Sequence, residues 1–214
     1  MSNINKDYIV EYLRSELPLN SGILLDMEKY AHEHRVPIIQ PEVANYIRVL
    51  LQMQDIKRVF ELGTAIGYSS IYMATAMPNC EKIITVEKQD QLVEIARKNI
   101  DLANLSDKIE VKHGMLQEIL PRIDEKFDMI FMDAAKSKYS EFLPYCLEAL
   151  KPGGLLVSDN VLYRGMIATD MIVPKRQRTI VRHMREYLHD IMHREDLATT
   201  ILPLGDGLAI SYKL

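Results

Sequence analysis

In this chain of 214 residues, three side chains carry oxygens that can bind a metal ion: Asp133, Asp159 and Asn160. A lysine, Lys136, lies three residues after Asp133. Two carboxylates and an amide are hard ligands that suit Mg²⁺ or Mn²⁺ and do not suit zinc. Near such a cation, the Lys136 amine could lose its proton and act as a base. Plainer explanations remain open, because Asp and Asn also cap turns and helices, and Lys136 also fits a surface position at a helix start.

A glycine-containing segment at residues 61–69 is the second place where the sequence indicates chemistry. Gly63 and Gly67 permit a tight turn and let a ligand approach backbone N–H groups at a helix start. The dinucleotide-binding pattern is not met, because Ala65 stands where it requires a glycine. Glu87, 24 residues after Gly63, could accept hydrogen bonds from a ribose diol. These features predict a nucleoside ligand without phosphates, although the glycines alone also fit a plain turn.

A run of cations without any acidic residue forms a third candidate site. Its five members are Lys175, Arg176, Arg178, Arg182 and Arg185. These side chains could pair with the phosphates of an RNA. The other interpretation is the solvated face of an amphipathic helix, with Ile180, Val181 and Met184 facing inward.

Alternating strands and helices must position these residues. The sequence predicts parallel strands at 58–62, 82–87, 108–113, 127–133 and 155–159, and helices at 68–77, 89–103 and 137–150. Two final strands, 199–204 and 208–213, flank a three-residue connection that is too short for a crossover helix, so they must pair antiparallel. Three helices, at 4–17, 21–34 and 41–53, precede the first strand.

The predicted fold class is therefore α/β: a doubly wound, mostly parallel seven-stranded sheet with an antiparallel C-terminal hairpin and an N-terminal helical extension. We expect a single domain over residues 1–214, with the extension at 1–53 and the core at 54–214. In open α/β sheets, ligands bind beyond the carboxyl ends of the strands. The candidate residues Gly63, Glu87 and Asp133 all lie at such ends.

Composition restricts the classes of protein that this chain can be. A net charge of −4, from 26 basic and 30 acidic residues, argues against a surface that binds nucleic acid everywhere. The apolar content of 48% can build a full core, and no apolar run is long enough to cross a bilayer. No secretory signal is evident, and two distant cysteines exclude a disulfide scaffold. We expect a cytoplasmic protein with no membrane partner.

Segments 60–69, 131–136 and 158–162 together resemble the metal-dependent class I S-adenosylmethionine O-methyltransferases, which include catechol and caffeoyl-CoA O-methyltransferases. The resemblance runs from about Val36 to the C-terminus. It implies a Rossmann-like methyltransferase fold, with S-adenosylmethionine and Mg²⁺ (or Mn²⁺) as cofactors.

The resemblance also implies a role for each site residue. Those expected at S-adenosylmethionine are Ile38, Glu61, Gly63, Tyr68, Ser69, Glu87, Gly114, Met115 and Asp133. Those expected at the metal are Asp133, Asp159 and Asn160, with Lys136 and Asp133 as the catalytic residues. Many relatives have an acidic residue where this chain has Met115, so only a backbone contact to the adenine is implied there.

Within that family, segments 63–69, 132–136, 159–165, 174–178 and 201–211 are most similar to the bacterial tRNA 5-hydroxyuridine methyltransferases. This similarity implies methylation of wobble 5-hydroxyuridine to 5-methoxyuridine, with tRNA as the partner. It assigns RNA contacts to Lys175, Arg176, Arg178 and Arg182. The family also implies a homodimer, with the N-terminal helices as its interface. Two other functions remain open: methylation of small catechols or phenylpropanoids, and non-catalytic binding of a nucleoside or RNA.

Overall fold

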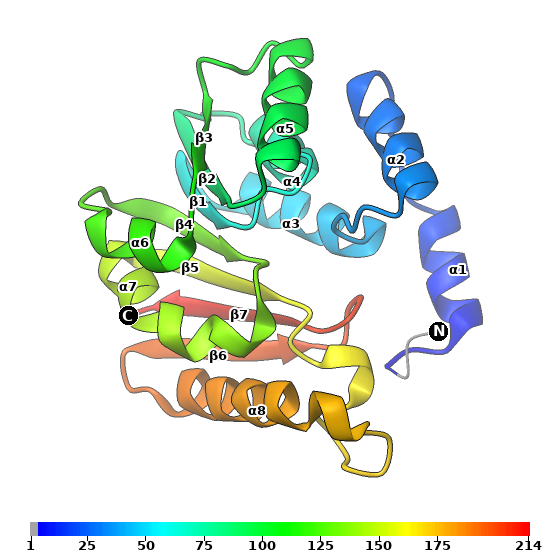
Figure 1. Cartoon of the computed structure of the whole chain (residues 1–214), viewed down its shortest axis with the longest axis vertical. Helices are drawn as coiled ribbons and strands as arrows, with labels where there is room; N and C mark the ends of the chain where they lie inside the picture. The colour runs from blue at the N-terminus through cyan, green and yellow to red at the C-terminus, as the bar shows by residue number, and fades with distance from the viewer. Residues whose placement is uncertain (1–3) are drawn as a thin grey trace. The chain divides into compact units, whose positions relative to one another are not determined.

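The computed structural model describes residues 4–214 of the chain, which form two compact units (Figure 1). The N-terminal unit comprises Arg14–Ile119, and the C-terminal unit comprises Leu120–Leu214 with the described residues before Arg14. These described residues contain seven strands, three in the N-terminal unit and four in the C-terminal unit. The division into an extension at 1–53 and a core at 54–214 stays a prediction.

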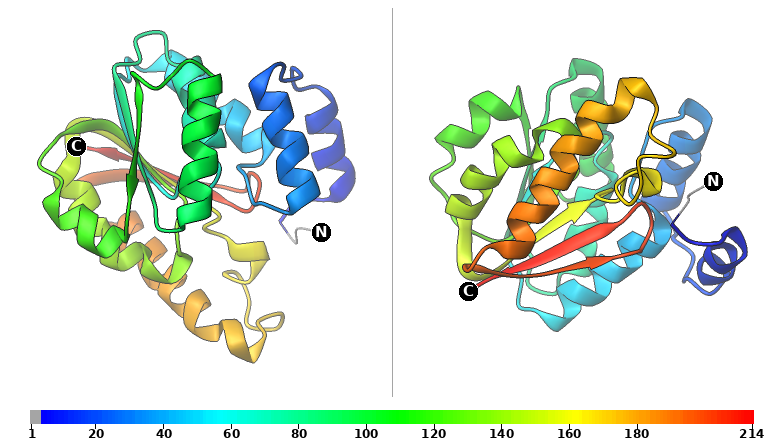
Figure 2. Two further views of the ribbon diagram at one scale, coloured as in Figure 1. Left: turned by 45° about the horizontal axis from the view of Figure 1, so that its top comes forward. Right: turned by 90° about the horizontal axis from the view of Figure 1, so that it is seen from below.

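Three parallel strands form the centre of the N-terminal unit, in the order β3-β2-β1. Their bounds are Arg58–Leu62 for β1, Lys82–Glu87 for β2 and Ile109–His113 for β3. The helices of this unit are α2 (Ile23–His34), α3 (Pro41–Met53), α4 (Tyr68–Ala76), α5 (Asp90–Leu102) and α6 (Leu116–Ile119). Five of the six residues of β2 are buried, as expected for a parallel strand covered on both faces. Helix α5 packs against β2 and β3 (Figure 2).

The C-terminal unit contains a mixed sheet in the order β4-β5-β7-β6. Its strands are β4 (Phe127–Met132), β5 (Leu150–Asp159), β6 (Leu197–Leu202) and β7 (Leu208–Lys213). Strand β4 is parallel to β5, and β7 is antiparallel to both β5 and β6. The chain therefore places its last strand inside this sheet, between β5 and β6.

Two long helices and four short 3-10 turns complete the C-terminal unit. They are α7 (Tyr139–Ala149), α8 (Arg178–His193), η1 (Leu120–Arg122), η2 (Lys136–Lys138), η3 (Tyr163–Gly165) and η4 (Lys175–Gln177). Helix α8 packs against α7 and β6. Val181 and Met184 are buried on this helix, as expected, whereas Ile180 is half-buried.

Most of the predicted elements are present, but β5 begins earlier than the sequence indicates. Residues 151–154, which were expected to form the loop after a helix, are part of this strand. Leu150 pairs with Phe127, and the register of the β4–β5 ladder then shifts before Met129. The Pro-Gly-Gly run thus occupies an irregular stretch of a strand, where a missing donor and absent side chains are tolerated.

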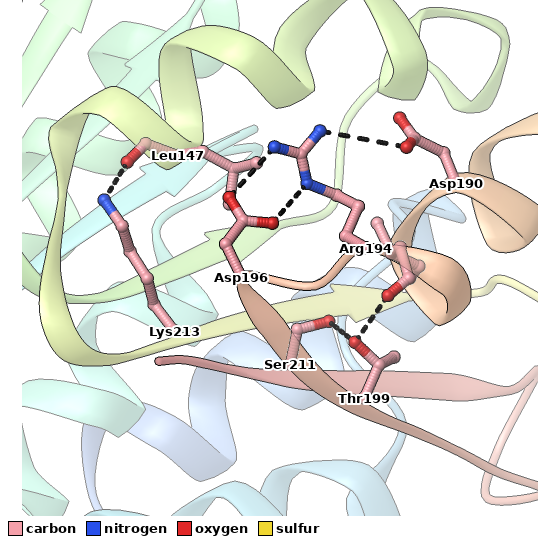
Figure 3. Close-up of polar contacts among 8 residues, drawn as sticks. Leu147, Asp190, Arg194, Asp196, Thr199, Ser211 and Lys213 are labelled. Carbon is pink, nitrogen blue, oxygen red and sulfur yellow. Dashed lines mark hydrogen bonds and ion pairs between the residues drawn. The ribbon is translucent and has the colours of Figure 1, made fainter.

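Side chains from the hairpin tie the ends of α7 and α8 to the sheet (Figure 3). Lys213 Nζ donates to the carbonyl oxygens of Leu147 at 2.6 Å and Leu150 at 2.8 Å, so a positive charge lies at the C-terminal end of α7. Thr199 Oγ1 of β6 donates to Ile191 O of α8 at 2.8 Å. In the connection between α8 and β6, the Arg194 guanidinium donates two hydrogen bonds, of 2.8 and 2.9 Å, to the Asp196 carboxylate. These contacts fix the end of the hairpin that is distant from the Gly205–Gly207 turn.

Helix α1 (Asp7–Ser15) has no buried residue. Tyr8 and Tyr12 are largely exposed, and Ile9 and Leu13 are partly so. The homodimer with the N-terminal helices as its interface stays a prediction. In residues 4–214, no helix has both the length and the apolar character needed to cross a membrane.

Candidate functional site

The turn after β1 has the backbone conformation that its glycines suggest. Gly63 has φ 105° and Gly67 has φ 85°, both in the region that favours glycine. Gly67 is the N-cap of α4, and Ala65, with φ 46°, lies between the two glycines. The turn therefore precedes a helix N-terminus, which suits a ligand that accepts hydrogen bonds from backbone N–H groups.

Glu87 is fixed beneath this turn by three backbone donors. Its Oε2 accepts a hydrogen bond from Ala65 N at 3.0 Å, and its Oε1 accepts from Lys88 N at 2.9 Å and Gln89 N at 3.0 Å. Only 9% of Glu87 is exposed. Because a carboxylate has about four acceptor positions, Glu87 can still accept a hydrogen bond from a ribose hydroxyl. The structure thus brings together Glu87 and the glycine turn.

Glu61 and Ser69, both expected at the cofactor, are in contact with each other. The hydroxyls of Ser69 and Ser70 donate to the two carboxylate oxygens of Glu61. Glu61 is completely buried at the end of β1. It therefore positions the first turn of α4 from below.

Tyr68 is held by two residues that no sequence pattern marks. Its hydroxyl donates to Glu28 Oε1 at 2.5 Å and accepts from Asn20 Nδ2 at 3.1 Å. Burial and the neighbouring Glu28 carboxylate raise the pKa of Tyr68 far above its usual value, so the phenol stays protonated. Asn20 and Glu28 lie in and before α2, 40 or more positions from Tyr68, and no local motif marks them.

Gly114 and Met115 follow β3 at the same edge as Glu87. Gly114 N donates to Glu87 O at 2.9 Å, and Met115 is 43% exposed. Ile38 is half-buried in the segment between α2 and α3. The roles of these three residues at the cofactor stay predictions.

The expected metal ligands lie at the ends of two neighbouring strands of the C-terminal unit. In the β4–β5 ladder Met132 pairs with Ser158, so Asp133 and Asp159 follow at matching positions. Lys136 Nζ donates to Asp133 Oδ1 at 2.6 Å. Asn160, directly after Asp159, donates its backbone N–H to Asp159 Oδ1 at 2.7 Å. The structure therefore brings together the acidic pair and the lysine predicted beside it.

The charges of this acidic pair suit a cation. Burial and then the Asp133 carboxylate raise the pKa of Asp159 to about 7, against the opposing effects of the Asn160 N–H and the Lys136 ammonium. The Asp133 and Asp206 carboxylates both act on Asp159 in this way, so a bound cation would relieve the repulsion between these acidic groups. In the described part of the chain, no three His, Cys, Asp or Glu side chains cluster as a metal site. The candidate donor set is two carboxylates completed by the amide of Asn160.

Tyr139 braces the ends of both strands that carry this acidic pair. Its buried hydroxyl lies 2.9 Å from Met132 O and 3.1 Å from Asp159 O. Its ring packs edge-on against Tyr187 of α8, with centroids 5.3 Å apart. No sequence pattern marks Tyr139, because a tyrosine at the start of a helix carries no signal of this role.

The five cations between Lys175 and Arg185 differ in whether they form ion pairs with acidic side chains. Arg185 donates to Ile167 O at 2.9 Å and to Asp170 Oδ1 at 2.8 Å, so it holds the preceding loop. Arg182 lies 3.7 Å from Glu186. The remaining three are exposed and form no ion pair with any residue that the structure describes: Lys175, Arg176 and Arg178. These three are the members available to an anionic partner.

Comparisons with known proteins agree with this geometry. A sequence model of a family described as O-methyltransferase matches residues 18–214. Catechol O-methyltransferase of Niastella koreensis is 34% identical over 173 residues, which cover 78% of each chain. Caffeoyl-CoA O-methyltransferase 1 of Eucalyptus globulus is 27% identical over 192 residues, covering 86% of this chain and 77% of that protein.

Solved structures show the same architecture. An O-methyltransferase from Bacillus cereus in complex with SAH is 25% identical, with a TM-score of 0.85 over 97% of each chain. TomG from Streptomyces achromogenes, an O-methyltransferase of tomaymycin synthesis in complex with SAM, is 25% identical, with a TM-score of 0.84 over 96% of each chain. These likenesses confirm the fold class predicted from the sequence.

Proposed function

We propose that this chain, which belongs to the O-methyltransferase family, transfers the methyl group of S-adenosylmethionine to a hydroxyl of an acceptor. The proposed acceptor is a small molecule with two neighbouring oxygens, such as a catechol or a phenylpropanoid. The names of the relatives support this acceptor class. The observation that carries the proposal is the acidic pair Asp133 and Asp159, with Lys136 bonded to Asp133.

For S-adenosylmethionine, the proposal rests on the turn after β1 and on Glu87. The ligand has a ribose with two free hydroxyls and no phosphate, which matches a glycine turn without a phosphate-binding pattern. Glu87 is already oriented by its backbone donors, so accepting a ribose hydroxyl requires no rearrangement of its carboxylate.

For the acceptor, the proposal assigns the metal to Asp133, Asp159 and Asn160. A divalent cation there supplies a lowered pKa for the acceptor hydroxyl and a fixed direction for its oxygen. Lys136 Nζ, when neutral, takes the hydroxyl proton; otherwise solvent takes it. The oxygen then forms a bond to the methyl carbon as the carbon–sulfur bond breaks, and S-adenosylhomocysteine leaves.

A second candidate acceptor is tRNA carrying 5-hydroxyuridine, whose 5-hydroxyl and 4-carbonyl are also neighbouring oxygens. The observation that favours it is the set of exposed, unpaired cations Lys175, Arg176 and Arg178. The relatives' names favour the small acceptors, so tRNA stands second.

The test measures transfer of a labelled methyl group from S-adenosylmethionine to catechol, to caffeate and to tRNA that lacks the modification. We expect methylation of a small acceptor that stops in EDTA and returns with Mg²⁺ or Mn²⁺. Asp133→Ala should lower the rate at least about 100-fold, since it removes charge stabilisation at the reacting centre.

Asp128→Ala is the matched control, because Asp128 lies at the opposite end of the same strand and pairs with Lys151. It should retain most of the activity. Full turnover in EDTA would disprove the role of the metal. Transfer to tRNA alone would favour the second candidate, and transfer to none of the acceptors would overturn the proposal.

A further inference from the structure

The six residues that follow β5 adopt an unusual backbone conformation. Three non-glycine residues have positive φ: Asn160 at 57°, Tyr163 at 45° and Arg164 at 57°. Residues other than glycine rarely adopt this backbone conformation, and they keep it only where their surroundings hold it there. Contacts with other parts of the unit must therefore hold the segment 160–165.

The turn between β6 and β7 supplies three hydrogen bonds to this segment. Val161 N donates to Gly207 O at 2.9 Å, and Leu162 N donates to Asp206 O at 3.0 Å. The Asp206 side chain adds a third bond, because its Oδ1 accepts from Arg164 N at 2.5 Å. The β5–β7 ladder ends with the pair Asp159 and Leu208, so the segment after Asp159 lies beside the turn before Leu208.

Gly207 allows this close approach. A Cβ at position 207 would lie 2.4 Å from Leu162 Cγ and 2.6 Å from Leu162 N, so no side chain fits there. Its φ of 91° also lies in the region that favours glycine. The turn and the segment therefore pack closely at Gly207, and Asp206, the residue before it, contacts the same segment.

From these contacts we propose that Asp206 is a positioning residue for the metal: it holds the segment 160–165, and so directs the Asn160 side chain toward the cation held by Asp133 and Asp159. The inference rests on the proposed metal site. Asn160 is the first residue of the held segment, and its φ of 57° is one that Asn adopts more readily than most residues. Loss of the bond from Arg164 N would leave only the two backbone bonds from Val161 N and Leu162 N, and we expect Asn160 then to adopt more than one conformation.

Asp206 could also act through its charge, since the carboxylate interacts electrostatically with Asp159 and Lys136. Two substitutions separate these effects. Asp206→Asn removes the charge and keeps an oxygen that can accept from Arg164 N, whereas Asp206→Ala removes both. Positioning predicts a large difference between these variants, and a pure charge effect predicts none.

The experiment measures Mn²⁺ binding to the purified full-length protein, without acceptor, by electron paramagnetic resonance of the free ion. Groups that orient metal ligands typically contribute 10–100-fold to affinity, so Asp206→Ala should weaken Mn²⁺ binding at least about tenfold. Asp206→Asn should stay within about threefold of the wild type. Gly207→Ala should weaken binding as Asp206→Ala does, because its Cβ would displace Leu162.

Asp196→Ala is the matched control, since it removes the same charge at the opposite end of the hairpin, and it should leave Mn²⁺ affinity unchanged. Thermal melting of each variant in EDTA, and binding of S-adenosylhomocysteine by calorimetry, show that the remaining structure is intact. Equal affinity of Asp206→Ala and wild type would overturn the positioning role alone, as would equal losses in the Ala and Asn variants. A wild-type protein that binds no Mn²⁺ would overturn the metal site itself, and with it this inference.

Discussion

At the scale of single residues, the carboxylate of Glu87 combines two tasks. It accepts hydrogen bonds from Ala65 N, Lys88 N and Gln89 N, and it is the group proposed to accept from the ribose. Glu87→Ala should therefore weaken binding of S-adenosylhomocysteine about tenfold or more, because a hydrogen bond to a charged group contributes about 1.5–3 kcal/mol. The effect on turnover should be mainly a raised KM for S-adenosylmethionine, since the contact exists before and during methyl transfer.

Calorimetry of Glu87→Ala tests this directly. Glu110→Ala is the matched control, because Glu110 lies on the neighbouring strand and pairs only with surface lysines, Lys82 and Lys112, among the residues described. Unchanged affinity in the Glu87 variant would remove this residue from the cofactor site.

Residue types at strand ends could be predicted from the sequence, but their supporting partners could not. Asp133, Asp159 and Glu87 each end a strand with a recognisable apolar pattern. Asn20, just before α2, and Glu28, within α2, contact Tyr68 from far earlier in the chain. Such contacts depend on tertiary packing, and no local spacing encodes them.

At the scale of elements, α8 is amphipathic, and its stability should depend on the buried face alone. Met184 is fully buried, whereas Met192 on the same helix is 44% exposed. Met184→Ala should lower the free energy of unfolding by about 2–5 kcal/mol, the usual effect of a cavity in a core. Met192→Ala, the matched control, should change it by less than about 0.5 kcal/mol. Denaturant titration measures both, and equal losses would show that burial does not distinguish the two positions.

The positions of strands and helices followed from periodicity, but their ends depended on packing. Strand β5 extends back through Pro152, Gly153 and Gly154, residues that by themselves predict a loop. Helix α7 contains Pro144, which by itself predicts a break. In both places neighbouring elements override a local preference. The positive-φ segment after Asp159 was missed for the same reason, since its conformation is imposed by a turn more than 40 residues later.

At the scale of the whole molecule, a net charge of −4 makes the three unpaired cations near the start of α8 a local exception. If they bind tRNA, neutralising Lys175, Arg176 and Arg178 together should weaken binding. Each lost phosphate contact should also flatten the slope of log K against log salt by about 0.7–0.9. A filter-binding salt series measures both. The control neutralises three exposed cations elsewhere, Arg35, Lys98 and Arg122, and should keep the wild-type slope. An unchanged slope in the first variant would identify these residues as an ordinary solvated surface.

The placement of β7 between β5 and β6 has a consequence for how the chain is made. A ribosome adds about 5–20 residues per second, so β7 emerges roughly 4–15 s after Asp133. Until then β5 has an open edge, and the segment after Asp159 lacks the turn that holds it. In a nascent chain, Asp133 and Asp159 are therefore present before the β6–β7 turn can hold the segment after Asp159. Until β7 pairs with it, the free edge of β5 can also pair with a strand of a neighbouring chain. We therefore expect chaperone protection to improve the yield of folded protein, and slow elongation late in synthesis to lower it. Both effects should be larger than for a protein whose last strand lies at the edge of its sheet.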